Sequence, residues 1–127
     1  MSSDPRQSLG QLGEDLACAE LQRRGYAILA RRFRTRLGEI DIVADHAGTL
    51  VFVEVKTRAG PAFGDGAAAV TAWKQRRVSL VAMEFLARQR AWNNRPCRFD
   101  VVSVDVGAGP DRRGSVEVFP GAFDARV

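Results

Sequence analysis

Apolar residues recur along the chain with two different periods, and these periods predict two helices and five strands. Between residues 8 and 24 leucine and alanine side chains recur at steps of three and four, which predicts a helix that ends at Gly25. A second stretch with the helical period covers residues 71–90. Strands are predicted over residues 26–34, 38–44, 49–56, 98–105 and 115–119.

The order of these elements indicates the fold class. The sequence α-β-β-β-α-β-β is typical of an α/β domain, with a central mixed sheet of four or five strands flanked by helices. Residues 49–56 are apolar on both alternating faces, as expected for a strand that is covered by helices on both sides. We therefore expect a single domain over residues 8–127, preceded by a polar leader of residues 1–7.

Three charged residues interrupt the two apolar strands of the stretch GEIDIVADHAGTLVFVEVKTR. Asp41 lies in the first strand, and Glu54 and Lys56 lie in the second. An unpaired charge in a buried strand costs several kcal/mol or changes its protonation state. These three residues are therefore the first candidates for a functional site.

The register of the predicted hairpin determines whether these charges meet. If Ala44 lies opposite Thr49 across a four-residue loop, Asp41 faces Phe52 and is diagonal to Glu54. Lys56 shares the face of Glu54, because side chains alternate along a strand. In the same register Glu39 faces Glu54, where it is either an outer member of the site or an exposed strand end.

Carboxylates that converge beside one lysine can be interpreted in two ways. In an environment of low dielectric constant the carboxylates repel one another, so a bound divalent cation would make the arrangement favourable. Few hard oxygen ligands with open positions suit Mg²⁺ or Mn²⁺ bound partly by substrate phosphates, which is a set of groups used for phosphodiester hydrolysis. The alternative interpretation is a structural ion pair at the end of a strand.

The composition of the chain limits the classes of protein to which it can belong. The net charge of +4 and the pI of about 9.8 are compatible with a polyanionic partner. Cys18 and Cys97 show no spacing typical of a zinc or iron–sulfur site. No apolar run approaches the ~18 residues of a membrane span, and the first residues contain no signal-peptide core, so we expect a cytoplasmic protein that does not enter the membrane.

Four segments in order carry a family resemblance: LGEDLACAEL, RRGYAIL, GEIDIVA and LVFVEVKTR. They resemble the YraN-like family of bacterial proteins, which is similar to the PD-(D/E)XK, or restriction-endonuclease-like, nuclease superfamily. The resemblance implies a three-layer core, metal ligation by Asp41, by Glu54 and by the backbone carbonyl of Val55, and Lys56 as the motif lysine. It also implies that Glu14 of the first helix assists the metal site.

Two elements leave alternatives open. Glu14 shares a helical stripe with Ala17 and Leu21, which would turn its carboxylate inward, whereas the leucines of the same helix mark a different stripe. On the second helix either Lys74 or Gln75 could face the site. The candidate nucleic-acid contacts are Arg58, Lys74, Gln75, Arg76 and Arg77. The aromatic residues Phe63 and Trp73 could stack on bases or pack in the core.

The resemblance implies a Mg²⁺- or Mn²⁺-dependent nuclease that hydrolyses phosphodiester bonds of DNA, with branched and single-stranded DNA in repair or recombination as candidate substrates. The alternative is a non-catalytic nucleic-acid-binding or adaptor protein on the same fold, and a third hypothesis is a structural ion-pair site with a protein partner. A chain of this size would need to form a homodimer to cut two strands symmetrically. The choice between DNA and RNA stays open.

Overall fold

The computed structural model describes residues 5–59, 70–90, 94–107 and 114–126, with side chains from residue 9 onward. Its elements are α1 (Pro5–Arg23), β1 (Ala27–Thr35), β2 (Gly38–His46), β3 (Thr49–Arg58), α2 (Ala72–Arg88), β4 (Cys97–Asp105) and β5 (Ser115–Phe123). The predicted α/β class and element order are confirmed. Helix α1 begins at Pro5, three residues before the predicted start of the first helix. Phe63 lies outside the described residues.

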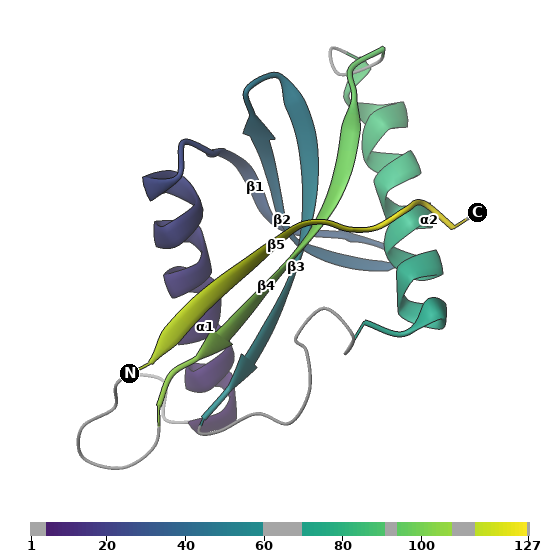
Figure 1. Cartoon of the computed structure of the whole chain (residues 1–127). Helices are drawn as coiled ribbons and strands as arrows, with labels where there is room; N and C mark the ends of the chain where they lie inside the picture. Colours follow the sequence, from purple (N-terminus) through teal and green to yellow (C-terminus); the bar gives the residue numbers. More distant parts are fainter. Residues whose placement is uncertain (1–4, 60–69, 91–93, 108–113, 127) are drawn as a thin grey trace.

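The five strands form one mixed sheet in the order β1-β2-β3-β4-β5. Strands β3 and β4 are parallel and are connected through α2, whereas the other neighbouring pairs are antiparallel. Figure 1 shows the twisted sheet between the two helices, with α1 on one side and α2 on the other. In the described part of the chain, no helix is long and apolar enough to cross a membrane.

Two hydrophobic clusters, one on each face of the sheet, hold the three layers together. Val51 and Val53 of β3 pack in the α1-side cluster, whereas Leu50 and Phe52 pack in the α2-side cluster. This alternation confirms that helices cover both faces of β3. Burial of apolar side chains on both faces removes a large apolar area from water and is the main stabilising term of the fold.

Helix α1 buries the stripe that contains Glu14, and the stripe of leucines is partly exposed. Ala17 and Leu21 are completely buried, whereas Leu12 and Leu16 are 40% and 37% exposed. The choice that the sequence left open is therefore resolved in favour of an inward-facing Glu14.

The turn between β2 and β3 is tighter than predicted. It contains only Ala47 and Gly48, both with positive φ (53° and 89°), as a two-residue type I′ turn requires. The side chain of Asp45 accepts a hydrogen bond from the Gly48 N–H group at 2.9 Å, which stabilises the turn. The predicted four-residue loop is therefore wrong.

The tighter turn shifts the register of the hairpin by two residues. Phe52 lies opposite Val43 rather than opposite Asp41, and the paired residues end with Ile42 opposite Val53. Asp41 and Glu54 each lie one residue beyond this last pair on their strands. Because the shift is an even number, the side chains of the paired residues 42–46 keep the predicted face of the sheet.

Gly13 allows the close approach of α1 to β3. A Cβ atom at Gly13 would lie 1.9 Å from Thr57 Oγ1, so Gly13→Ala should lower the free energy of unfolding by about 1–3 kcal/mol. Gly10→Ala on the same helix is the matched control, because its Cβ would have no neighbour within 4 Å. Urea denaturation should show Gly10→Ala stabilised by up to about 1 kcal/mol, and equal behaviour of the two variants would contradict this packing.

Candidate active site

Asp41 lies where the regular alternation of β2 is interrupted. Ile40 packs in the α2-side cluster and Ile42 in the α1-side cluster, although residues two apart on a regular strand share one face. The carboxylate of Asp41 accepts a hydrogen bond from the Val55 N–H group at 2.8 Å. The Asp41 side chain thus binds the β3 backbone just beyond the last backbone pair of the two strands.

Glu54 presents a buried carboxylate beside Asp41. The residue is 3% exposed, and its Oε1 atom lies 3.3 Å from Nζ of Lys74. Its Oε2 atom is buried and has no hydrogen-bond partner in the described part of the chain. A buried carboxylate oxygen without a donor is costly, so this atom marks a place where a further positive or donor group would be favourable.

Burial sets the protonation of this acidic pair. Burial first, and then the negative charge of Asp41, raises the pKa of Glu54 to about 8. Burial also raises the pKa of Asp41, against the lowering effect of the hydrogen bond from Val55. Two ionised carboxylates only accept hydrogen bonds, so near neutral pH the pair is stabilised by holding a proton between them.

The donor set fits a small hard cation. Asp41 and Glu54 supply carboxylate oxygens, and the unpartnered Oε2 atom of Glu54 is available to a ligand. Among the described residues, no group of three or more Asp, Glu, His or Cys side chains could hold a metal ion. Two carboxylates suffice for Mg²⁺, which commonly completes its octahedron with water and substrate phosphates. The role of the Val55 carbonyl stays a prediction.

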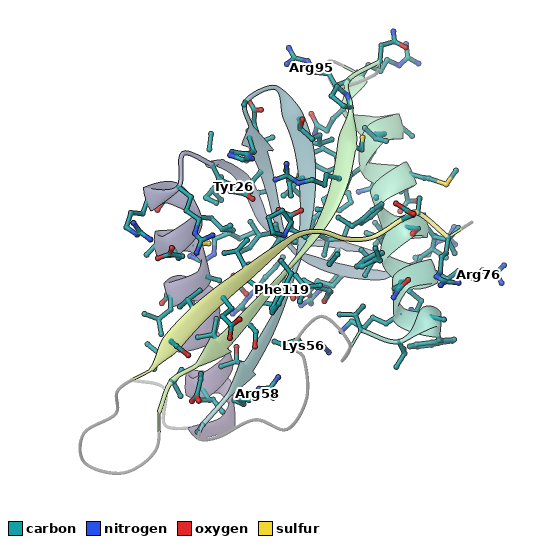
Figure 2. All side chains as sticks on the ribbon, in the orientation of Figure 1. Tyr26, Lys56, Arg58, Arg76, Arg95 and Phe119 are labelled. Carbon is teal, nitrogen blue, oxygen red and sulfur yellow. The ribbon has the colours of Figure 1, made fainter. Side chains whose placement is uncertain are left out.

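Of the two lysines of the chain, Lys74 contacts the acidic pair, and no such contact is made by Lys56 within the described residues. Lys74 in the first turn of α2 pairs with Glu54, which resolves the choice between Lys74 and Gln75. Its position is fixed by the helix cap, where its N–H group donates to Thr71 Oγ1. Lys56 lies two residues beyond Glu54 on the same strand and makes no ion pair within the described residues. Figure 2 shows the Lys56 side chain leaving β3 toward the side of α2.

Glu14 is buried but is not brought to the acidic pair. Its two carboxylate oxygens bind Arg31 Nε at 2.8 Å and Arg32 Nε at 3.1 Å. Two successive residues of a regular strand point to opposite faces, but Arg32 has a left-handed φ of 54°, which allows both guanidinium groups to reach Glu14. Glu14 therefore connects α1 to β1, and a direct part in catalysis stays a prediction.

Gln75 is occupied by contacts within the chain. Its Nε2 group donates to the carbonyl of Val70 at 2.9 Å, and its Oε1 atom accepts from Arg126 Nε at 2.7 Å. The backbone N–H group of Arg126 also donates to Ser79 Oγ. Gln75 thus fastens the C-terminal segment to α2, and its predicted contact with nucleic acid stays untested.

The three predicted arginine contacts occupy different places. Arg76 lies on the outer side of α2 and Arg58 near the end of β3 (Figure 2). The guanidinium group of Arg77 donates to the carbonyl of Leu37 at 2.9 Å and stacks over Trp73, 4.8 Å from the ring centre. These cations therefore do not form one compact patch, although Arg58 follows Lys56 closely along β3.

A second polar network lies on the α1 side of the sheet. The buried Asp100 accepts from Arg98 Nε at 2.8 Å, from the hydroxyl of Tyr26 at 2.8 Å and from the N–H group of Gly121 at 2.9 Å. His46 stacks on the Tyr26 ring and accepts from Arg98. Arg98 and Asp100 both lie on β4, two residues apart, so their contact is local. No spacing in the sequence connects Tyr26 and His46 to it, because Tyr26 directly precedes β1 and His46 ends β2.

Comparison with known proteins identifies the class to which this α/β sheet and its acidic pair belong. The sequence model of the Uncharacterised protein family UPF0102 matches residues 13–104, a range that includes Asp41, Glu54, Lys56 and Lys74. The chain belongs to this family, which confirms the predicted YraN-like resemblance.

Its relatives are bacterial proteins of similar length. The UPF0102 protein of Symbiobacterium thermophilum is 48% identical over 117 residues, covering 92% of this chain and 97% of the relative. The UPF0102 protein of Syntrophotalea carbinolica is 49% identical over 122 residues, with 94% of both chains covered. A UPF0102 protein of Pseudomonas aeruginosa is 42% identical over 118 residues, covering 91% of this chain and 92% of the relative.

Proposed function

We propose that this protein is a Mg²⁺- or Mn²⁺-dependent nuclease that hydrolyses phosphodiester bonds of DNA. The observation that carries the proposal is the acidic pair formed by the half-buried Asp41 and the buried Glu54. The Glu54 Oε2 atom has no hydrogen-bond partner in the described part of the chain, and the same strand carries Lys56. Like charges that are buried together lower the stability of a folded protein. They are expected at sites that bind a cation and a phosphate.

Each residue has a defined task in this mechanism. Asp41 and Glu54 hold the cation, and the hydrogen bond from Val55 orients the Asp41 carboxylate. The bound ion would supply Lewis-acid polarisation of the phosphate and of the attacking water. Lys56 is not engaged in an ion pair within the described residues, so its ammonium group is available to orient that water and to stabilise the extra charge of the transition state.

A non-catalytic nucleic-acid-binding protein is the second candidate. It is favoured by the contact between Lys74 and Glu54, which together with a shared proton neutralises the acidic pair without metal. Such a protein would bind nucleic acid through its arginines with strong salt dependence. Its binding would survive loss of the Asp41 carboxylate.

Cleavage of labelled nucleic acids in Mg²⁺, Mn²⁺ or EDTA tests the proposal. The panel contains single-stranded, duplex, flap and four-way-junction DNA, and RNA. We expect cutting that requires the metal and falls about a hundredfold or more in Asp41→Asn, because the cation loses a ligand.

Asp45→Asn is the matched control for this experiment. It removes the same charge from the same strand, at a side chain that binds only the turn N–H group of Gly48 in the described structure. The control should cut like the wild type. Equal activity of Asp41→Asn and wild type would identify a contaminant, and binding without cutting under every metal would favour the second candidate.

A further inference from the structure

Trp73 is an aromatic side chain at the surface. It is 66% exposed, the largest value among the exposed large apolar side chains of the described residues. It lies in the first turn of α2 and directly precedes Lys74, whose ammonium group pairs with Glu54. The alternative of packing in the core, which the sequence left open, is therefore excluded for Trp73.

The indole ring is held by a fixed cation on one side. The Arg77 guanidinium group lies 4.8 Å from the ring centre, and its Nε atom donates to the Leu37 carbonyl in the turn between β1 and β2. Leu37 itself is 43% exposed. Trp73, Arg77 and Leu37 thus form an aromatic–cationic surface, which we name the Trp73 platform, beside the first turn of α2.

We propose that the Trp73 platform stacks an unpaired nucleobase of the DNA strand that enters the site. This inference rests on the proposed function and narrows its substrate to DNA with unpaired bases, single-stranded or branched. An exposed tryptophan provides a flat face on which any base can stack, and the adjacent cations Lys74, Arg76 and Arg77 suit the neighbouring phosphates. In a continuous duplex both faces of each base are already covered by its neighbours.

Binding in EDTA tests the platform without catalysis. Fluorescence anisotropy of labelled single-stranded and duplex DNA should show Trp73→Ala binding single strands about tenfold more weakly, because stacking of one base contributes at this level. Trp73→Phe should recover part of the affinity, and duplex binding should change little. Met83→Ala is the matched control, since Met83 is 54% exposed on the same helix and should leave both affinities unchanged.

Tryptophan emission gives a second readout of the same contact. The chain contains two tryptophans, so a Trp92→Phe background assigns all tryptophan emission to Trp73. Single-stranded DNA should quench this emission, and duplex DNA should quench it much less. Unchanged emission during binding of single strands, or an equal loss of single-strand and duplex affinity in Trp73→Ala, would overturn the stacking proposal.

The two proposals fail in different ways. Metal-dependent cleavage with no effect of Trp73→Ala on single-strand affinity would retain the nuclease and reject the platform. Binding that depends on Trp73 without cleavage under any metal would retain the platform and reject the nuclease. If the wild type binds no nucleic acid in EDTA, the platform proposal is rejected as well, and a protein partner becomes the better explanation of this exposed surface.

Discussion

Replacing Glu54 with glutamine is expected to make the metal-free protein more stable at pH 8 while it removes the proposed nuclease activity. The folded state raises the pKa of Glu54 to about 8 from an ordinary value of 4.5. The protonated form is therefore favoured by folding. Its stabilising contribution is complete below pH 4.5 and is lost as the pH rises through about 8.

The size of this effect follows from proton linkage. Between the two pKa values, each pH unit costs the wild type about 1.4 kcal/mol of unfolding free energy if a single proton is involved. Glutamine keeps the shape of the side chain and offers an N–H donor to Asp41, and it has no charge to bury. The unfolding temperature of wild type in EDTA should thus fall by several degrees from pH 5 to pH 8, whereas Glu54→Gln should lose much less.

Thermal unfolding followed by circular dichroism at four pH values in this range measures the difference. Glu117→Gln is the matched control, because Glu117 is exposed on β5 and the same exchange there should leave the wild-type slope intact. Cleavage by Glu54→Gln should fall about a hundredfold or more, since a metal ligand is lost. Equal pH slopes for wild type and Glu54→Gln would show that burial of this carboxylate is not costly.

Glu54→Gln is expected to raise the stability of the metal-free protein and to lower cleavage. These opposite effects indicate why the protein has a charged residue at this position. A buried residue that only served packing would be better replaced by an uncharged one. A site that must accept a cation has to keep its carboxylates, even though they destabilise the empty protein. The combination of a stabilised variant and a lost activity would therefore separate a functional carboxylate from a structural ion pair.

The sequence was sufficient to predict the sheet face on which the site lies, and insufficient to predict its register. Alternation along β3 depends only on the period of two, so Glu54 and Lys56 could be assigned to the Phe52 face. The placement of Asp41 beside Glu54 depends on the length of the turn, and Asp45-His46-Ala47-Gly48 is compatible with a longer loop. Only the positive φ angles of Ala47 and Gly48 reveal the two-residue turn.

Contacts between distant elements were beyond sequence reasoning. An inward Glu14 was one of two orientations that the sequence allowed for α1, and its two arginine partners depend on the left-handed backbone of Arg32, which no local pattern indicates. Lys74 and Gln75 are neighbours on a helix, and each has apolar companions on its own stripe. The helical period alone does not determine which of the two residues faces Glu54.

Substitution of Lys56 and substitution of Lys74 should affect different properties of the protein. Lys56→Met should reduce cleavage about a hundredfold or more, because its ammonium group is the one left available for the water and the transition state. The stability of the metal-free protein should hardly change, since no ion pair of the described residues is broken. Single-turnover cleavage and thermal unfolding of the same preparation measure both quantities.

Lys74→Met should act on the metal instead. The ammonium group of Lys74 lies 3.3 Å from Glu54 Oε1, so an entering cation must compete with it for the same carboxylate. A partly exposed ion pair contributes up to about 1 kcal/mol, so its removal should tighten Mn²⁺ binding by up to about fivefold. It should also lower the stability of the metal-free protein. Arg76→Met removes one positive charge from the exposed side of the same helix and should leave Mn²⁺ affinity nearly unchanged.

Titration calorimetry with Mn²⁺ on the four proteins distinguishes local competition from a general charge effect. Tighter binding in Lys74→Met alone would mean that Lys74 neutralises Glu54 until the metal arrives and is then released toward the substrate phosphates. Weaker binding in Lys74→Met would contradict this role, because it would mean that the lysine organises the carboxylates for the metal. A hundredfold loss of cleavage in Lys74→Met with normal cleavage in Lys56→Met would exchange the catalytic assignments of the two residues.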